Sequence, residues 1–278
     1  MNQSNSPYIF VIGNEKGGAG KTTCSMHLIA SLLNEGFKVG SIDVDCRQHS
    51  LTRYLQNREN YNKQNPEQAV LMPSHRLLQE AKADNIKEKE ALEQADFESA
   101  LAETQRDADI IIIDTPGSHS YFSQLAHSYA NTVITPINDS FIDIDVIAKI
   151  NPDNMEIIAP SIYSQMVWQQ KLQRAQRDGG SIDWVIMRNR LSTLDAVNKR
   201  NVAAILEKFS KRIACKQAPG FSERVIFREL FLQGLTLLDL NKTNYDRSFN
   251  LSHVAARHEL RQFLKCLNID KIKQKAVM

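Results

Sequence analysis

The sequence predicts an α/β fold in which helices cover both faces of a mostly parallel, twisted sheet. The first observation is a series of short apolar runs rich in β-branched residues, which are typical of buried parallel strands. These runs lie at residues 8–12, 38–42, 108–113, 132–137 and 184–187. The second observation is helical spacing of apolar residues between them, at 22–33 and 123–130. The third is the order strand, helix, strand at the start, which implies a right-handed βαβ unit.

Length and composition indicate one globular domain. The chain has 278 residues, of which 42% are hydrophobic and 24% charged, and a single α/β domain of this length is common. We therefore expect one domain over residues 1–278. Residues 53–107 differ because they are rich in Glu, Lys, Gln and Asn, and they include the run Lys87-Glu88-Lys89-Glu90. This composition predicts a polar helical insertion with oppositely charged side chains paired along its exposed face.

The cysteines and the chain ends point to the cytoplasm. The four cysteines lie far apart without metal-type spacing, at Cys24, Cys46, Cys215 and Cys266. Scattered thiols suit a reducing compartment, and we expect them to act as small buried hydrophobic residues. Residues 1–7 lack the basic and apolar regions of a signal peptide. Because no apolar run approaches the roughly 20 residues of a membrane span, we do not expect a membrane partner.

A glycine-rich segment joins the first predicted strand to the first predicted helix. It reads Gly13-Asn14-Glu15-Lys16-Gly17-Gly18-Ala19-Gly20-Lys21-Thr22-Thr23. Glycines let the backbone form a concave nest whose N–H groups point at phosphate oxygens, and the following helix adds its positive dipole end. The spacing places Lys21 at the β- and γ-phosphates and the Thr22 hydroxyl at Mg²⁺. The predicted nucleotide-binding residues here are Gly17, Gly18, Ala19, Gly20, Lys21, Thr22 and Thr23.

Three aspartates at strand ends are further candidates. Asp114 ends an all-apolar strand, where a carboxylate can hold Mg²⁺ through its water shell. Asp43 and Asp45 end the second predicted strand and are two residues apart, so both would face the phosphates in an extended segment. The alternative for each is a carboxylate that caps the following turn.

The glycine-rich segment resembles the deviant Walker A motif of the MinD/ParA superfamily of P-loop ATPases. It has Glu15 where the standard P-loop has glycine, and it carries an additional lysine, Lys16. The resemblance implies that Lys16 reaches across a homodimer to the nucleotide of the partner, much as an arginine finger acts in trans. It also implies that Asp45 positions the attacking water, that Asp43 lies near Mg²⁺, and that Asn189 binds the adenine edge. The expected catalytic residues are Lys16, Lys21 and Asp45.

Within this superfamily the chain most resembles the MipZ family of division-plane positioning ATPases. The segments that carry the resemblance outside the phosphate loop are Asp45-Cys46-Arg47-Gln48, Thr135-Pro136-Ile137-Asn138-Asp139-Ser140-Phe141, Arg188-Asn189-Arg190-Leu191, Arg228-Glu229-Leu230-Phe231 and Gly234-Leu235-Thr236-Leu237-Leu238-Asp239-Leu240. The resemblance implies an ATP-dependent homodimer that binds non-specific DNA and the centromere protein ParB. It also implies that the protein inhibits FtsZ assembly and is located in the cytoplasm, at the nucleoid and the cell poles.

A basic stretch offers separate support for DNA binding. Residues 188–228 contain ten lysines and arginines but only three acidic residues. A helix predicted at about 195–213 would bury one apolar face and expose basic side chains, as contacts with DNA phosphates require. The candidate contacts are Arg200, Lys211, Arg224 and Arg228. The alternative is a basic helix face that only contacts solvent.

Three other functions are alternatives. A ParA-like DNA-segregation ATPase would share the same motifs. A MinD-like membrane ATPase would use the basic, amphipathic stretch 251–278, although a docked terminal helix explains its pattern as well. A metabolic relative such as a ligase or an iron-protein reductase would need a second substrate pocket or a cysteine pair after Asp114, and the sequence indicates neither.

Overall fold

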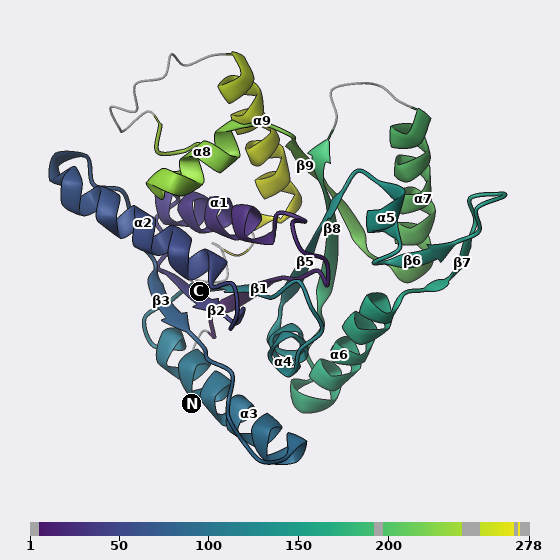
Figure 1. Cartoon of the computed structure of the whole chain (residues 1–278), viewed down its shortest axis with the longest axis horizontal. Helices are drawn as coiled ribbons and strands as arrows, with labels where there is room; N and C mark the ends of the chain where they lie inside the picture. Colours follow the sequence, from purple (N-terminus) through teal and green to yellow (C-terminus); the bar gives the residue numbers. More distant parts are fainter. Residues whose placement is uncertain (1–5, 192–196, 241–250, 270–271, 273–278) are drawn as a thin grey trace.

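The computed structural model describes residues 6–191, 197–240, 251–269 and 272. Within them, seven strands form one sheet in the order β3-β2-β4-β1-β5-β8-β9, and every neighbouring pair is parallel (Figure 1). These strands are β1 (Tyr8–Ile12), β2 (Val39–Asp43), β3 (Ser74–Leu77), β4 (Ile110–Asp114), β5 (Thr132–Asn138), β8 (Asp183–Leu191) and β9 (Lys216–Ser222). A separate antiparallel hairpin pairs β6 (Ala148–Ile150) with β7 (Ile157–Pro160).

Helices cover both faces of the sheet, as the sequence predicted. They are α1 (Lys21–Asn34), α2 (Ser50–Gln64), α3 (Ile86–Gln105), α4 (Tyr121–Tyr129), α5 (Phe141–Ile144), α6 (Ile162–Asp178), α7 (Val197–Ile213), α8 (Ile226–Gln233) and α9 (Leu251–Cys266). One apolar layer lies between the sheet and α3, α4, α6 and α7. The opposite layer lies beneath α1, α2 and α9 (Figure 1).

The central strands have no solvent-facing side, which explains their continuous apolar sequence. In β1, Ile9 and Val11 enter the first layer, whereas Phe10 and Ile12 enter the second. Successive side chains of a strand point to opposite faces, so a strand covered on both sides needs apolar residues at every position. The four isoleucines of β4 follow the same rule and are fully buried.

Residues 53–107 contain the expected helices but also a strand. Within this stretch β3 pairs in parallel with β2 and forms one edge of the sheet. The segment is therefore partly built into the central sheet, which its polar composition did not indicate. Strand β3 lies at an edge of the sheet, and its exposed residues alternate with half-buried ones. Because none of its side chains is fully buried, its sequence Ser-His-Arg-Leu lacks the apolar run of an inner strand.

The C-terminal helix α9 is docked onto the sheet. Leu260 and Phe263 are buried against residues of α1 and β9. Val254 is 49% exposed and does not belong to the apolar face that the sequence suggested. The basic residues Lys271, Lys273 and Lys275 lie outside the described residues. In the part of the chain that the structure describes, no helix has the length and apolar character of a membrane span.

Candidate active site

The predicted phosphate loop lies between β1 and α1, at the carboxyl edge of the sheet. Strand β1 has β4 on one side and β5 on the other, so the chain changes direction across the sheet at this point. Open α/β sheets bind ligands in the crevice outside such a point. A cavity of about 570 Å³ opens there. It is lined by Gly17, Gly18, Gly20, Lys21, Thr22, Thr23, Asp45, Arg47, Gln48, Ser50, Tyr54, Thr115, Pro116, Gly117, Ser118, Arg190 and Phe231.

Glycine is required at two positions of the loop. Gly18 has φ +73° and Gly20 has φ +91°, a region that only glycine adopts readily. At Gly20 a Cβ would also lie 2.0 Å from Nδ2 of Asn189. A neighbouring loop also lies close, since a Cβ at Gly117 would be 2.9 Å from the nitrogen of Gly17. The loop is thus a concave backbone surface at the start of α1, where N–H groups are free to bind an anion.

The two lysines of the loop point to different places. Lys21 lies inside the cavity, and its Nζ donates to the carbonyl of Lys16 at 3.0 Å. Burial lowers the pKa of Lys21, although nearby Asp114 and Asp45 oppose this effect. Lys16 does not line the cavity; its Nζ lies 2.6 Å from Oδ2 of Asp143, and its side chain is 32% exposed.

Asp114 is fixed by two hydroxyl groups of α1. Thr22 donates to one carboxylate oxygen at 2.8 Å, and Ser25 donates to the other at 2.7 Å. Burial, reinforced by the neighbouring carboxylate of Asp43, raises the pKa of Asp114 to about 7. A hydroxyl and a carboxylate in contact are oxygen ligands of the type that Mg²⁺ prefers, and a cation here would also offset the burial of this charge. Thr22 and Asp114 therefore fit a magnesium site.

Asp43 and Asp45 differ in their access to the cavity. Asp43 is buried and accepts bonds from the backbone nitrogen and hydroxyl of Thr52, at 2.9 and 2.8 Å, and from the nitrogen of Asp45. This arrangement favours the alternative in which Asp43 caps the turn into α2. Asp45 lines the cavity and accepts from the nitrogens of Arg47 and Gln48 through one carboxylate oxygen, Oδ1.

Asn189, the predicted adenine contact, lies against the phosphate loop. Its Nδ2 donates to the carbonyl of Ala19 at 2.8 Å. A β-bulge interrupts the pairing of β8 with β9 at this residue, and a Cβ at Gly220 would lie 1.1 Å from the carbonyl oxygen of Arg188. The bulge therefore needs this glycine, and it turns Asn189 toward the loop. A second cavity of about 250 Å³, lined in part by Asn189, Phe227 and Phe231, continues from the first.

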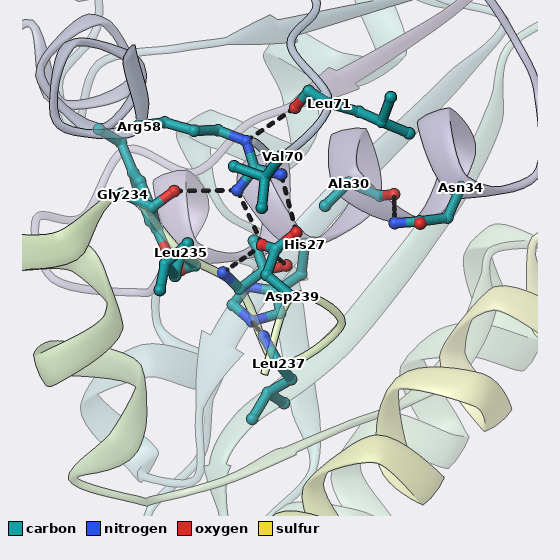
Figure 2. A network of polar contacts seen from close by, with 12 residues as sticks. His27, Ala30, Asn34, Arg58, Val70, Leu71, Gly234, Leu235, Leu237 and Asp239 are labelled. Carbon is teal, nitrogen blue, oxygen red and sulfur yellow. Dashed lines mark hydrogen bonds and ion pairs between the residues drawn. The ribbon is translucent and has the colours of Figure 1, made fainter. Parts of the chain in front are cut away.

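The wall of the cavity is held by a buried network between α2 and the segment that follows α8. Arg58 is fully buried and forms a bidentate ion pair with Asp239, at 2.7 and 2.9 Å (Figure 2). The same guanidinium donates to the carbonyls of Gly234 and Leu71. Asp239 also accepts from the backbone nitrogen and hydroxyl of Thr236. Burial raises the pKa of Asp239, but the bonds from Arg58 outweigh burial and hold it below its usual value.

This network explains residues that the sequence analysis did not single out. Tyr54 donates to the carbonyl of Leu235 at 2.6 Å, and both Tyr54 and Phe231 line the cavity. A Cβ at Gly234 would lie 2.0 Å from the backbone nitrogen of Arg58, so glycine is needed where the two segments touch. The sequence pointed to this network only through the segment 234–240, which carries the family resemblance but had no role assigned to it.

The four candidate DNA contacts lie in two environments. Helix α7 buries Val202, Leu206 and Phe209 as predicted, and Arg200 and Lys211 are exposed. Arg228 on α8 has a side chain that is 73% exposed. Arg224 is different, because its side chain is 13% exposed and lies 2.6 Å from Glu259 of α9. Asp195, the predicted start of this α7 helix, lies outside the described residues.

Comparison with known proteins supports the interpretation of this geometry. The model of the ATPase MipZ family matches residues 8–271. A McdA variant from Cyanothece in complex with ATP has a TM-score of 0.63 at 17% identity, over 94% of this chain and 96% of that chain. The septum site-determining protein MinD from Pyrococcus horikoshii, complexed with Mg-ADP, has a TM-score of 0.57 at 16% identity, over 97% of this chain and 98% of that chain.

The structure of a plasmid partition protein from Borrelia burgdorferi is similar to this chain to about the same degree. Its TM-score is 0.56 at 19% identity, over 94% of this chain and 99% of that chain. At such identities these structures show a shared fold, which confirms the predicted P-loop architecture of the MinD/ParA type. A comparison with curated protein sequences gives no match.

Proposed function

Because the chain belongs to the ATPase MipZ family and is therefore an ATP-hydrolysing enzyme, we propose that it is an ATP-dependent dimerising switch that positions the bacterial division plane. The observation that carries the proposal is the direction of Lys16. Lys16 does not line the cavity of its own protomer, and its side chain lies partly exposed beside Asp143. A lysine in this position is suited to act on the nucleotide of a second copy.

In this proposal ATP binds with its phosphates in the loop and its base near Asn189. Lys21 contacts the β- and γ-phosphates, and Thr22 and Asp114 hold Mg²⁺, with Asp43 behind them as a buried carboxylate. Asp45 orients the water that attacks the γ-phosphate. Two structurally similar proteins, McdA in complex with ATP and MinD in complex with Mg-ADP, support ATP with Mg²⁺ as the ligand.

Hydrolysis would reverse the assembly. Two ATP molecules lie between two protomers, and Lys16 of each protomer neutralises charge on the nucleotide of the other. Once the γ-phosphate is lost, this contact is lost as well, and the protomers separate. Slow turnover is expected of such a switch, because its output is the lifetime of the dimer.

The partners in the proposal are non-specific DNA, ParB and FtsZ. The exposed residues Arg200, Lys211 and Arg228 would contact DNA phosphates without reading the bases, and Arg224 would take part only if its ion pair with Glu259 opened. A dimer presents this basic surface twice, which retains it on the nucleoid. Binding to ParB near the cell poles and inhibition of FtsZ assembly rest on family membership.

Light scattering provides the first test. The molar mass of the protein is measured with and without a non-hydrolysable ATP analogue and Mg²⁺, for the wild type, Lys16→Ala and the control Lys63→Ala. Lys63 is an exposed lysine of α2 that pairs with Glu59. We expect the analogue to double the mass of the wild type and the control but not of Lys16→Ala. A mass that does not respond to the analogue in the wild type contradicts the proposal.

Two further assays separate the division-plane function from its relatives. Purified FtsZ is polymerised with increasing amounts of the dimer, and DNA binding is measured on a random duplex. Inhibition of FtsZ together with DNA binding supports the proposal. DNA binding without any effect on FtsZ indicates a ParA-like segregation ATPase instead.

A further inference from the structure

A tyrosine hydroxyl lies directly beneath the phosphate loop. Tyr163, in the first turn of α6, is 2% exposed, and its hydroxyl donates to the carbonyl of Gly13 at 2.8 Å. Gly13 follows the last residue of β1, so this bond holds the loop where it leaves the sheet. A Cβ at Gly13 would lie 2.3 Å from Nε2 of His127 and 2.9 Å from the Tyr163 hydroxyl. The glycine is thus required by the two side chains packed below it.

Side chains of β5 and α4 contact this hydroxyl, and a side chain of β8 contacts one of them. Thr135 of β5 lies 2.9 Å from it, and His127 of α4 lies 3.1 Å from it. The Nε1–H of Trp184, on β8, donates to the Thr135 hydroxyl at 2.9 Å. Because the indole can only donate, the Thr135 hydroxyl proton is left to point at the Tyr163 oxygen. The Tyr163 oxygen is therefore an acceptor for Thr135, and its own proton must go elsewhere.

Two acceptors compete for that single proton. Nδ1 of His127 lies 2.6 Å from the carbonyl of Ser123, which only accepts, so Nδ1 carries the proton of the ring. Complete burial lowers the pKa of His127 to about 4, which keeps the ring neutral and leaves Nε2 without a proton. Nε2 is then an acceptor, as is the carbonyl of Gly13. The Tyr163 oxygen lies closer to the Gly13 carbonyl oxygen, at 2.8 Å, than to Nε2 of His127, at 3.1 Å. One hydroxyl proton cannot fully satisfy both buried acceptors.

We propose that Tyr163 is a positioning residue of the phosphate loop, and that His127 weakens its hold by competing for the same hydroxyl proton. When the proton is on Gly13, the start of the loop is fixed and its N–H groups are preorganised for phosphate. When the proton turns to His127, the Gly13 carbonyl loses its bond and the loop is less well held. Helix α4 thereby influences nucleotide affinity without touching the nucleotide.

The test compares two substitutions with opposite expected effects. Tyr163→Phe keeps the ring and removes the hydroxyl, and we expect the Kd of a non-hydrolysable ATP analogue with Mg²⁺ to rise about five-fold, the value of one ordinary hydrogen bond. His127→Leu is of similar size but has no acceptor, and we expect binding equal to or tighter than that of the wild type. Tyr129→Phe serves as the control, because the Tyr129 hydroxyl contacts Glu98, remote from the loop.

Both key substitutions are expected to lower the melting temperature, so calorimetric titration well below that temperature provides the readout that a purely structural role would not change. Wild-type affinity in Tyr163→Phe, or weakened affinity in both variants, overturns the inference. If Tyr163→Phe does not fold, tighter binding by His127→Leu supports the inference and any other result overturns it. Absence of analogue binding by the wild type would instead count against the ATP site itself.

Discussion

Nζ of Lys16 lies 2.6 Å from Oδ2 of Asp143 in the same protomer, although 127 positions separate the two residues in the chain. Asp143 is itself held by Ser140 and by the backbone nitrogen of Asn138. Burial raises the pKa of Asp143, but the bonds from Lys16, Ser140 and Asn138 outweigh burial and keep it below its usual value. The lysine that is proposed to act in trans thus has a defined resting position in the protomer.

This ion pair should be measurable as a coupling in the nucleotide-free protein. Lys16→Ala and Asp143→Asn are each expected to lower the free energy of unfolding by about 1 kcal/mol or less, since the lysine is partly exposed. The double variant should lose less than the sum of the two, because the shared interaction is removed only once. Urea unfolding of the four proteins gives the coupling. Strict additivity would mean that the pair contributes nothing to stability.

Substitution of Asp45 should separate binding from hydrolysis. In Asp45→Ala we expect ATP to bind and the dimer to form, while single-turnover hydrolysis falls about 100-fold, as is usual when a group that activates water is removed. Filter assays measure the bound ATP, light scattering measures dimer formation, and the single-turnover rate measures hydrolysis. A variant that no longer binds ATP would show that Asp45 has a structural or metal-binding role instead.

Asp114 should make the nucleotide-free protein less stable as the pH rises. Its folded pKa of about 7 lies above that of an unfolded aspartate, so the folded state binds the proton more tightly and loses stability between about pH 4 and 7. Asp114→Asn does not titrate. The difference in melting temperature between this variant and the wild type should therefore favour the variant more at pH 8 than at pH 5. Each kcal/mol of unfolding free energy that the wild type loses corresponds to about 2–4 °C.

The same variant should lose magnesium-dependent hydrolysis, because an amide is a poorer ligand for Mg²⁺ than a carboxylate. Asp153→Asn provides the matched control, since Asp153 is an exposed residue between β6 and β7. It should change neither the pH dependence of the melting temperature nor the rate of hydrolysis. Equal pH profiles for Asp114→Asn and the wild type would contradict the assigned burial of this charge.

Removal of Arg58 should be costly. In Arg58→Met the carboxylate of Asp239 remains buried without its partner, and we expect a loss of about 3–5 kcal/mol in the free energy of unfolding. Arg76→Met, which removes a pair that is about half exposed on both sides, should cost about 1 kcal/mol or less. Because Arg58 lowers the pKa of Asp239, the pair stabilises the fold above about pH 4 and this stabilisation is lost on further acidification. The difference between wild type and Arg58→Met should therefore narrow in acid.

The basic surface should contribute to DNA affinity through charge alone. Arg200→Ala combined with Lys211→Ala is expected to weaken binding to random duplexes and to reduce the slope of log K against log salt by about 2, at about 0.9 per phosphate contact. Dimerisation with the ATP analogue should be unchanged. The control combines Lys82→Ala with Lys87→Ala, two exposed lysines near the start of α3.

Arg224 should respond differently from the exposed basic residues. Since its side chain is largely buried against Glu259, Arg224→Ala is expected to lower the melting temperature more than the DNA affinity. A salt slope reduced as strongly as by Arg200→Ala would show that the ion pair opens on DNA.

Features encoded by neighbouring residues were predictable from the sequence. The apolar runs of β1, β4 and β5 identify strands that are covered on both faces, because every position in such a strand is buried. The loop, Lys21 and Thr22 were identified from their spacing, and Asp114 from its place at a strand end. A strand with little apolar content, β3, was missed because an edge strand is not required to have that pattern.

Only the tertiary structure decided which distant side chains meet. The sequence by itself determined the P-loop fold and the position of the glycine-rich loop in it, since turns, glycine positions and strand periodicity act within a few residues. It did not determine that Lys16 rests on Asp143, that Arg58 is paired with Asp239, or that Tyr163 holds Gly13. These contacts join residues more than a hundred positions apart, and their formation depends on how whole layers of helices pack on the sheet.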